Sequence, residues 1–269
     1  MSGFSAEWLA LREPHDLRAR NPAVLAAVSA AFRSSKSTRV VDLACGAGST
    51  SRAVAGHLPA QQHWDLVDND PQLLAVACNR ASSNEIKLSP TELDLTADFE
   101  VMLDGRKDLI TTSALLDLVS EEWLERLVGR SAAHELPVYA ALSYDGRIDL
   151  SPSDPCDTMV VTAVNAHQLT DKGFGPALGP SAAAAAIAKF EAAGYSVVQG
   201  ASDWVIGTDD LRMQNELLEG WAAAANEIHA LSRSDLDRWL FNRKSFVNER
   251  VSTMRVGHVD FFAVPSVKR

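Results

Sequence analysis

The residues best placed to do chemistry lie in the stretch RVVDLACGAGSTS at positions 39–51. Its apolar start, at residues 40–43, predicts a buried parallel strand, and a turn of small residues with Gly46 and Gly48 follows. Glycine at these two positions lets the backbone adopt dihedral angles closed to other residues and lets a ligand lie directly on it. A hydroxyl side chain at 49–51 can cap the helix expected next, whose first N–H groups would face a ligand at the carboxyl edge of the sheet.

Two further acidic residues stand at the ends of the next two predicted strands. The run 63–68 predicts a second strand that ends in Asp68, and Pro71 would open the following helix. The third strand–helix unit ends in Leu93-Asp94-Leu95. A carboxylate at Asp68 can accept hydrogen bonds from a ribose diol, and one at Asp94 can accept from an adenine amino group. These chemistries predict an adenosine-shaped site.

These features resemble the class I S-adenosylmethionine-dependent methyltransferases. The first motif of that family, an acidic residue followed by a Gly-x-Gly turn, matches Asp42, Gly46 and Gly48. The frequent first glycine of the family is Ala44 here, which is a departure from the pattern. The resemblance implies S-adenosylmethionine as the cofactor, with Asp68 on the ribose and Asp94 on the adenine side. It implies cofactor-binding residues at Asp42, Ala44, Gly46, Gly48, Asp68, Asn69, Asp94, Leu95, Ser113 and Leu115.

The segment after the fourth predicted strand would pass beside the transferred methyl group in this family. Ser113 and the residues up to Leu116 would then line the methionine arm of the cofactor. Asp117 is the reactive side chain of the segment, although a carboxylate at a helix start or on the surface is the alternative interpretation.

The loop after the fifth strand is the best candidate for acceptor binding. It contains HQLTDKGFGP at 167–176, with polar and aromatic residues between glycines. His167 is predicted to be the catalytic base if the acceptor must lose a proton, because the unperturbed pKa of histidine, about 6.5, suits that task. A structural histidine is the alternative. The substrate-binding residues predicted with it are Arg12, Tyr144, Gln168, Lys172 and Phe174.

The elements that must position these residues alternate along the chain. Strands are predicted at 39–45, 63–68, 90–95, 108–114 and 137–143, with a turn at Asp145-Gly146, and helices at 50–57, 71–80, about 97–103 and 120–132. A further helix at 181–193 and a sixth strand at 195–205 follow, and a last strand at about 253–264 would lie antiparallel between the fifth and sixth, as in the methyltransferase arrangement. The fold class predicted is α/β: a doubly wound, seven-stranded, mostly parallel sheet with a final antiparallel strand and helical lid insertions.

The domain organisation follows from the same pattern. Residues 1–38 are predicted to form an N-terminal helical cap, in which the charged run 12–20 is either a solvated helix surface or a cover over the cofactor. Residues 39–269 form the methyltransferase-like domain, with insertions at about 146–180 and 209–249 that meet as a lid.

Composition narrows the partners. The chain has 269 residues and a formal net charge of −10, which opposes binding to nucleic acid or to anionic membranes and leaves a small molecule as the expected substrate. Three cysteines without C-x-x-C spacing and the lack of a signal-peptide pattern predict a reduced, cytoplasmic chain. Seven scattered histidines lack metal-ligand spacing, so no metal is expected. A homodimer is left open.

Three alternatives compete with the methyltransferase prediction. An NAD(P)-dependent oxidoreductase fits poorly, because Ser51 stands where a third glycine is expected and no Tyr-x-x-x-Lys pair follows. A hydrolase is disfavoured by the lack of a G-x-S-x-G elbow. A non-catalytic S-adenosylmethionine-binding protein stays open, because function resides in the site and not in the fold.

Overall fold

The computed structural model describes residues 4–79 and 85–266. Its strands are β1 (Ser37–Leu43), β2 (Gln61–Asp68), β3 (Ile86–Glu92), β4 (Leu109–Ser113), β5 (Val138–Ser151), β6 (Tyr195–Ala201), β7 (Trp204–Ile206) and β8 (Thr253–Pro265). Its α-helices are α1 (Ala6–Ala19), α2 (Pro22–Phe32), α3 (Ser49–Val54), α4 (Pro71–Asn79), α5 (Glu121–Ala133), α6 (Asp157–Gln168), α7 (Ala182–Ala192), α8 (Leu211–Glu227) and α9 (Arg233–Asn248). Short 3₁₀ turns are η1 (Ala55–His57), η2 (Phe99–Leu103) and η3 (Gly179–Ser181).

The strands form one mixed sheet in the order β3-β2-β1-β4-β5-β8-β6, with β7 also paired to β8. Strands β1 to β5 pair in parallel, whereas β8 runs antiparallel to β5, β6 and β7. The predicted doubly wound sheet and the place of its last strand are therefore confirmed. The strand count rises to eight because the predicted sixth strand is interrupted at Ser202 and Asp203, which divide it into β6 and β7.

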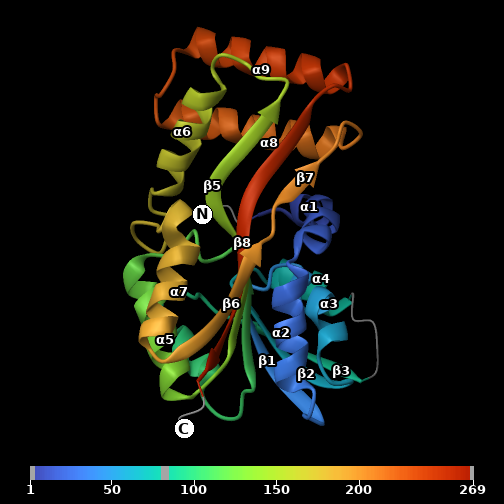
Figure 1. The fold of residues 1–269 in the computed structure, drawn as a ribbon, viewed down its shortest axis with the longest axis vertical. Coiled ribbons are helices and arrows are strands. Elements are labelled where there is room, and N and C mark those ends of the chain that lie inside the picture. Colours follow the sequence, from blue (N-terminus) through green and yellow to red (C-terminus); the bar gives the residue numbers. More distant parts are fainter. Residues whose placement is uncertain (1–3, 80–84, 267–269) are drawn as a thin grey trace.

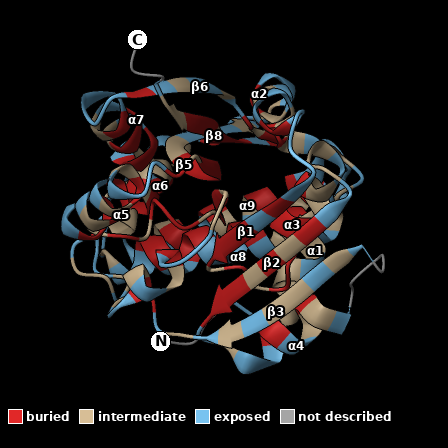
Figure 2. Ribbon diagram, turned by 90° about the horizontal axis from the view of Figure 1, so that it is seen from below, coloured by how far each residue is buried: buried red, intermediate tan, exposed pale blue. Residues whose placement is uncertain are grey.

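Two helical layers cover the two faces of the lower part of the sheet. Neighbouring residues of a strand point to opposite faces, so a strand with adjacent apolar residues must be covered on both. Val40 and Trp64 pack with buried residues of α2, α3 and α4, whereas Val41 and Val67 pack with those of α5 and α7. Figure 1 shows these layers on either side of the strands, and Figure 2 shows buried residues gathered on the strands and on the inward sides of the helices. In β1 and in β2, apolar side chains at adjacent positions are therefore buried on opposite faces, as in a parallel sheet covered on both sides.

A second core lies above the carboxyl edge of the parallel strands. There β5 and β8 continue as a two-stranded ribbon, with β7 beside β8, and α6, α8 and α9 pack around it (Figure 1). The centre of this core includes Trp221 of α8 and Trp239 of α9. The elements of the two predicted insertions thus pack together.

The fifth strand differs most from the prediction. It was expected to end at residue 143 with a turn at Asp145-Gly146, but β5 continues to Ser151. The pairing of β5 with β8 shifts its register between Tyr144 and Ile148, and the Asp145-Gly146 pair lies within this shift. Gly146 has φ +88°, in the left-handed region. A side chain at Gly257 on the opposite strand would collide with Asp145. The Asp-Gly pair therefore forms a bulge and not a chain reversal.

The third strand also differs, since it spans Ile86–Glu92 and not 90–95. Pro90 lies inside it, where the sequence pattern placed the beginning of the strand. Because β3 is an edge strand, a proline is tolerated there without losing a hydrogen bond needed inside the sheet. Asp94 consequently lies in the connection after the strand and not within it.

Candidate functional site

The turn after β1 has an unusual backbone. Ala44, Gly46 and Gly48 have φ values of +54°, +50° and +78°, in the left-handed region that favours glycine. The turn is closed by the Gly48 N–H, which donates to the Cys45 carbonyl at 2.9 Å. A Cβ at Gly46 would lie 3.2 Å from Leu9 Cδ1, so both conformation and close approach explain glycine at this position.

Asp68 is bound directly to this turn. Its Oδ2 accepts a hydrogen bond from the Gly46 N–H at 2.8 Å, and its Oδ1 accepts from the Asp70 N–H at 3.0 Å. Burial raises the pKa of Asp68, and the backbone hydrogen bonds oppose that rise. The carboxylate that ends β2 and the glycine turn that follows β1 are therefore brought together, as their positions at strand ends predict.

Asp42 lies under the turn, within the sheet. Its side chain is fully buried, and Oδ1 accepts a hydrogen bond from the Thr111 hydroxyl at 2.7 Å. Burial raises the pKa of Asp42 to about 7. Its Oδ2 has no hydrogen-bond partner among the described residues. Asp42 thus ties β1 to β4 immediately before the turn.

The predicted residues on the adenine side are more exposed. Asp94 is exposed and accepts from the Thr96 N–H at 2.9 Å, which lowers its pKa. Leu95 is buried, and its carbonyl accepts from the Trp123 indole N–H at 2.7 Å. The Leu93 N–H donates to the Asp68 carbonyl at 2.9 Å, which links this connection to the end of β2, beside which Asn69 is exposed.

The predicted methionine-arm residues follow β4. Ser113 accepts a hydrogen bond from Arg20 Nη2 at 3.4 Å, and Leu115 is packed in the core of the sheet. Between them Ala114 has φ +52°, and its N–H donates to the Ala141 carbonyl at 2.9 Å. A second left-handed turn therefore lies at the carboxyl edge, one strand away from the first.

Helix α1 lies over the glycine turn. Leu9 approaches Gly46, and Glu13 forms an ion pair of 2.6 Å with Arg52 of α3. Further along, Arg12 is buried and pairs with Asp16 at 3.0 Å, while the Arg12 guanidinium lies 4.9 Å from the centre of the Trp204 ring. The charged run 12–20 is therefore largely turned toward the protein.

A cluster of buried side chains lies beneath α1, made of Asp117, Tyr144, Trp204 and His258 together with Arg12. The His258 ring is 4.7 Å from that of Trp204 and 6.1 Å from that of Tyr144. Burial raises the pKa of Asp117 to about 6, opposed by backbone hydrogen bonds that include Tyr144 and by the charge of Arg12. Burial and the same Arg12 charge lower the pKa of His258 to about 3.

His258 and Trp204 were missed by sequence reasoning. His258 follows Gly257 in the last strand, and no spacing signal marks it. Only the pairing of β8 with β5 and β7 brings it to Tyr144 and Trp204. Trp204 was recognised only as the end of a strand.

The predicted acceptor loop lies elsewhere. His167 Nε2 lies 3.0 Å from Glu227 Oε2, and Lys172 Nζ lies 3.2 Å from His167 Nδ1. Gln168 is the last residue of α6. The Phe174 ring packs 5.8 Å from the Trp123 ring. In the described part of the chain these contacts join the loop to α5 and α8, and none of them joins it to the glycine turn, so the role of His167 as a base stays a prediction.

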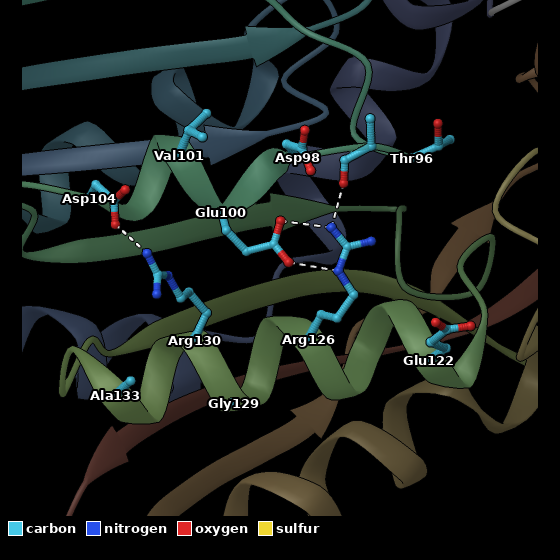
Figure 3. A pocket seen from close by; sticks show the side chains of 11 residues that line it. Thr96, Asp98, Glu100, Val101, Asp104, Glu122, Arg126, Gly129, Arg130 and Ala133 are labelled. Atoms are coloured by element: carbon cyan, nitrogen blue, oxygen red, sulfur yellow. Dashed lines mark hydrogen bonds and ion pairs between the residues drawn. The ribbon is translucent and has the colours of Figure 1, made fainter.

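A surface groove between η2 and α5 contains none of the predicted catalytic or binding residues. Figure 3 shows Arg126 and Arg130 of α5 reaching across it to Glu100 and Asp104. These ion pairs hold the connection after Asp94 against α5. Such a groove, lined by paired charges, has a structural role here.

Comparisons with known proteins agree with this geometry. Residues 40–134 match a family model described as a methyltransferase domain. No curated protein matches the chain in sequence. A cyclopropane-fatty-acyl-phospholipid synthase-like protein from Lactobacillus casei superposes with a TM-score of 0.53 at 14% identity, covering 97% of this chain and 94% of that one. The cyclopropane synthase MmaA2 from Mycobacterium tuberculosis gives 0.48 at 9% identity, covering 90% and 83%.

The Lactobacillus casei likeness establishes the fold, and the family match covers the glycine turn, Asp68 and Asp94. Residues 40–134 therefore match a methyltransferase domain. The likeness of the chain as a whole to known proteins is one of fold.

Among residues 4–79 and 85–266, no three His, Cys, Asp or Glu side chains are grouped so that they could hold a metal ion. No helix in the same ranges is long and apolar enough to cross a membrane.

Proposed function

We propose that this protein transfers the methyl group of S-adenosylmethionine to a small-molecule acceptor at oxygen, nitrogen or a carboxylate. The observation that carries the proposal is the hydrogen bond between Asp68 and the glycine turn, which contains three left-handed residues. A turn with no room for a side chain at Gly46 and a carboxylate held against it fit an adenosine-type ligand.

The positions of the residues around the glycine turn and the strand ends indicate which of them would hold each part of the cofactor. Asp68 accepts from the ribose hydroxyls, the backbone at Ala44, Gly46 and Gly48 lies against the ligand, and Asp42 supports the turn from below. Asp94, Leu95 and Asn69 would bound the adenine, and Ser113 and Leu115 the methionine arm. When bound, the cofactor supplies an electrophilic methyl group whose leaving group is a neutral sulfur, so the protein needs no acid there.

The contribution of the chain is mainly to position the acceptor, a proximity effect worth several kcal/mol, about 7–11 in the best oriented cases. Residues 1–38, through α1, would cap the site, and the insertions at about 146–180 and 209–249 would form the lid. Buried side chains under α1 would exclude water from the reacting atoms. Arg12 and Tyr144 lie there and would orient the acceptor, as Gln168, Lys172 and Phe174 would from the loop.

The setting of the protein is part of the proposal. A net charge of −10 and three free thiols support a reduced, cytoplasmic protein that acts on small molecules and not on nucleic acid. A homodimer stays a prediction that sedimentation velocity can test.

Calorimetric titration tests the cofactor site. S-adenosylhomocysteine should bind to the wild-type protein, whereas NAD should not. Asp68→Ala should weaken this binding by about tenfold or more, because each hydrogen bond to a charged group contributes about 1.5–3 kcal/mol. Asp98→Ala, at the exposed groove, is the matched control and should change nothing. Unchanged affinity in Asp68→Ala, or preference for NAD, would contradict the proposal.

Turnover separates an enzyme from a non-catalytic binding protein. Methyl-labelled cofactor is incubated with a panel of small metabolites, and transfer of label is measured with wild-type protein and with Asp68→Ala. Label transferred only by wild-type protein supports the enzyme. Tight cofactor binding without transfer to any member of the panel favours the binding protein.

A further inference from the structure

The cluster under α1 contains two buried polar atoms without partners. Asp117 is 7% exposed and His258 is 5% exposed, yet Asp117 Oδ1 and His258 Nδ1 have no hydrogen-bond partner in the part of the chain that the structure describes. Buried polar atoms are nearly always paired, because an unpaired one costs about 1–3 kcal/mol. Two such atoms in one cluster are able to bind a group that the chain does not itself supply.

The position of Asp117 is fixed by the fold. It follows β4 at the carboxyl edge of the sheet, and its carbonyl accepts from the Gly179 N–H at 3.0 Å. Tyr144 lies near both residues, since its backbone is among the groups that lower the pKa of Asp117 and its ring centre lies 6.1 Å from that of His258. The Tyr144 hydroxyl is already used, because it donates to Asn165 Oδ1 at 2.7 Å. Tyr144 therefore bounds the cluster with its ring.

The charges of the cluster do not cancel. The Arg12 guanidinium is engaged by Asp16 through Nε and Nη2, and Asp16 also accepts from the Trp204 indole N–H at 2.9 Å. This pair is neutral as a unit. The Asp117 carboxyl is left as the extra acidic group of the cluster, and burial keeps the His258 ring of the same cluster uncharged. A second carboxylate placed here would be repelled, whereas an N–H or O–H group would be held.

We infer that Asp117 Oδ1 and His258 Nδ1 bind the methyl acceptor, and that the acceptor is a hydroxyl or amine compound with an apolar body and not a carboxylic acid. The hydrogen-bond donor of the acceptor lies on Asp117, and its body lies against the rings of Tyr144 and Trp204. This inference rests on the proposed function. Of its three acceptor classes it keeps hydroxyls and amines and removes carboxylates.

The test uses three probes that differ in one group: benzyl alcohol, benzylamine and benzoate. Each is titrated calorimetrically into the full-length protein saturated with S-adenosylhomocysteine. Benzyl alcohol or benzylamine should bind at least about tenfold more tightly than benzoate. Asp117→Ala and His258→Ala should each weaken binding of the preferred probe by about tenfold, and Asp98→Ala should not.

Folding and function are controlled in the same experiment. Circular dichroism and the affinity for S-adenosylhomocysteine are measured for each variant, and Asp117→Asn, which keeps an acceptor oxygen, should retain part of the alcohol binding if Asp117→Ala does not fold. Tightest binding of benzoate, or its tightening in Asp117→Ala, overturns the inference in favour of an acid held by Arg12. Binding of no probe while S-adenosylhomocysteine binds also overturns it and leaves water as the partner. Loss of S-adenosylhomocysteine binding to wild-type protein would instead contradict the proposed function.

Discussion

At the scale of single residues, three of the six described non-glycine residues with positive φ lie at one edge of the sheet. Ala44 follows β1, Ala114 follows β4 and Leu142 lies in β5, and these three strands are neighbours in the sheet. All three residues have positive φ. A left-handed conformation costs a residue with a side chain about 1–2 kcal/mol, and such costs cluster where a protein binds or reacts. The edge identified by the motif is thus also the strained edge.

Ala44→Gly should raise the free energy of unfolding by about 0.5–1 kcal/mol. Glycine removes the strain at φ +54°, although it also increases the entropy of the unfolded chain. Urea unfolding measures the change. Ala47→Gly is the matched control, because Ala47 lies in the same turn and is not among the residues with positive φ that the structure describes, so this variant should lose about 0.5–1 kcal/mol. Equal destabilisation by both variants would contradict the strain argument.

At the scale of elements, the lower sheet could be predicted because its signals are local. An apolar run, a small-residue turn and an acidic strand end each lie within one strand–helix unit, so Gly46 and Asp68 were correctly expected to be neighbours. The extension of β5 could not be predicted. The pairing of Tyr144 with His258 joins residues far apart in the sequence, and that pairing overrides the local preference of Asp145-Gly146 for a turn.

The same reason limits what could be predicted of the candidate site. Arg12 and Tyr144 carry recognisable chemistry and lie in the cluster under α1. His258 lies beside Tyr144 and Trp204 only because of the register in which β8 pairs with β5 and β7, and no local sequence pattern predicts that register. His167, selected for its chemistry alone, pairs with Glu227 of α8.

Helix α1 should open more often when its ion pair with α3 is removed. The Glu13–Arg52 pair is only partly exposed, and an ion pair of this kind contributes about 1 kcal/mol at most. Glu13→Gln should therefore speed hydrogen exchange in residues 6–19 by up to about fivefold. Arg233→Gln, which breaks an exposed pair within α9, should leave exchange in α1 unchanged. Equal exchange in α1 of Glu13→Gln and wild-type protein would show that Leu9 and Arg12 hold the helix alone.

His258 should make the fold sensitive to acid. Its pKa is about 3 in the folded protein and about 6.5 in the unfolded chain, so the unfolded state binds a proton first as the pH falls. Its contribution to stability is present above pH 6.5 and is lost progressively down to pH 3, at about 1.4 kcal/mol per pH unit.

Asp42 and Asp117 act in the opposite direction, because their raised pKa values make stability fall as the pH rises from about 4 toward 7 and 6, respectively. The variant His258→Gln isolates the histidine. Between pH 6.5 and 5 it should lose about 2 kcal/mol less stability than the wild-type protein in urea unfolding. His134→Gln, at an exposed histidine, is the control and should follow the wild-type curve. A His258→Gln curve parallel to the wild-type curve would contradict the assignment.

At the scale of the whole molecule, two cores share two strands. The lower halves of β5 and β8 lie in the sheet between α2 and α7, and their upper halves lie among α6, α8 and α9 (Figure 1). Because β5 and β8 are hydrogen-bonded in both cores, unfolding of one core removes strand contacts from the other. We therefore expect the upper layer to unfold together with the lower sheet, and the cluster under α1 lies where the two meet.

Trp239→Ala should consequently destabilise the whole protein. Trp239 is fully buried in the upper core and donates its indole N–H to Asp157 at 2.8 Å, so its truncation should cost about 3–5 kcal/mol. Native-state hydrogen exchange should show the loss equally in α8 and in the distant strands β1 and β4, because all of them exchange through one global opening. Phe241→Ala, at an exposed position of the same helix, should change stability by less than about 0.5 kcal/mol. Loss of protection confined to α8 and α9 would mean that the upper layer unfolds alone and that the cluster under α1 can open while the glycine turn stays folded.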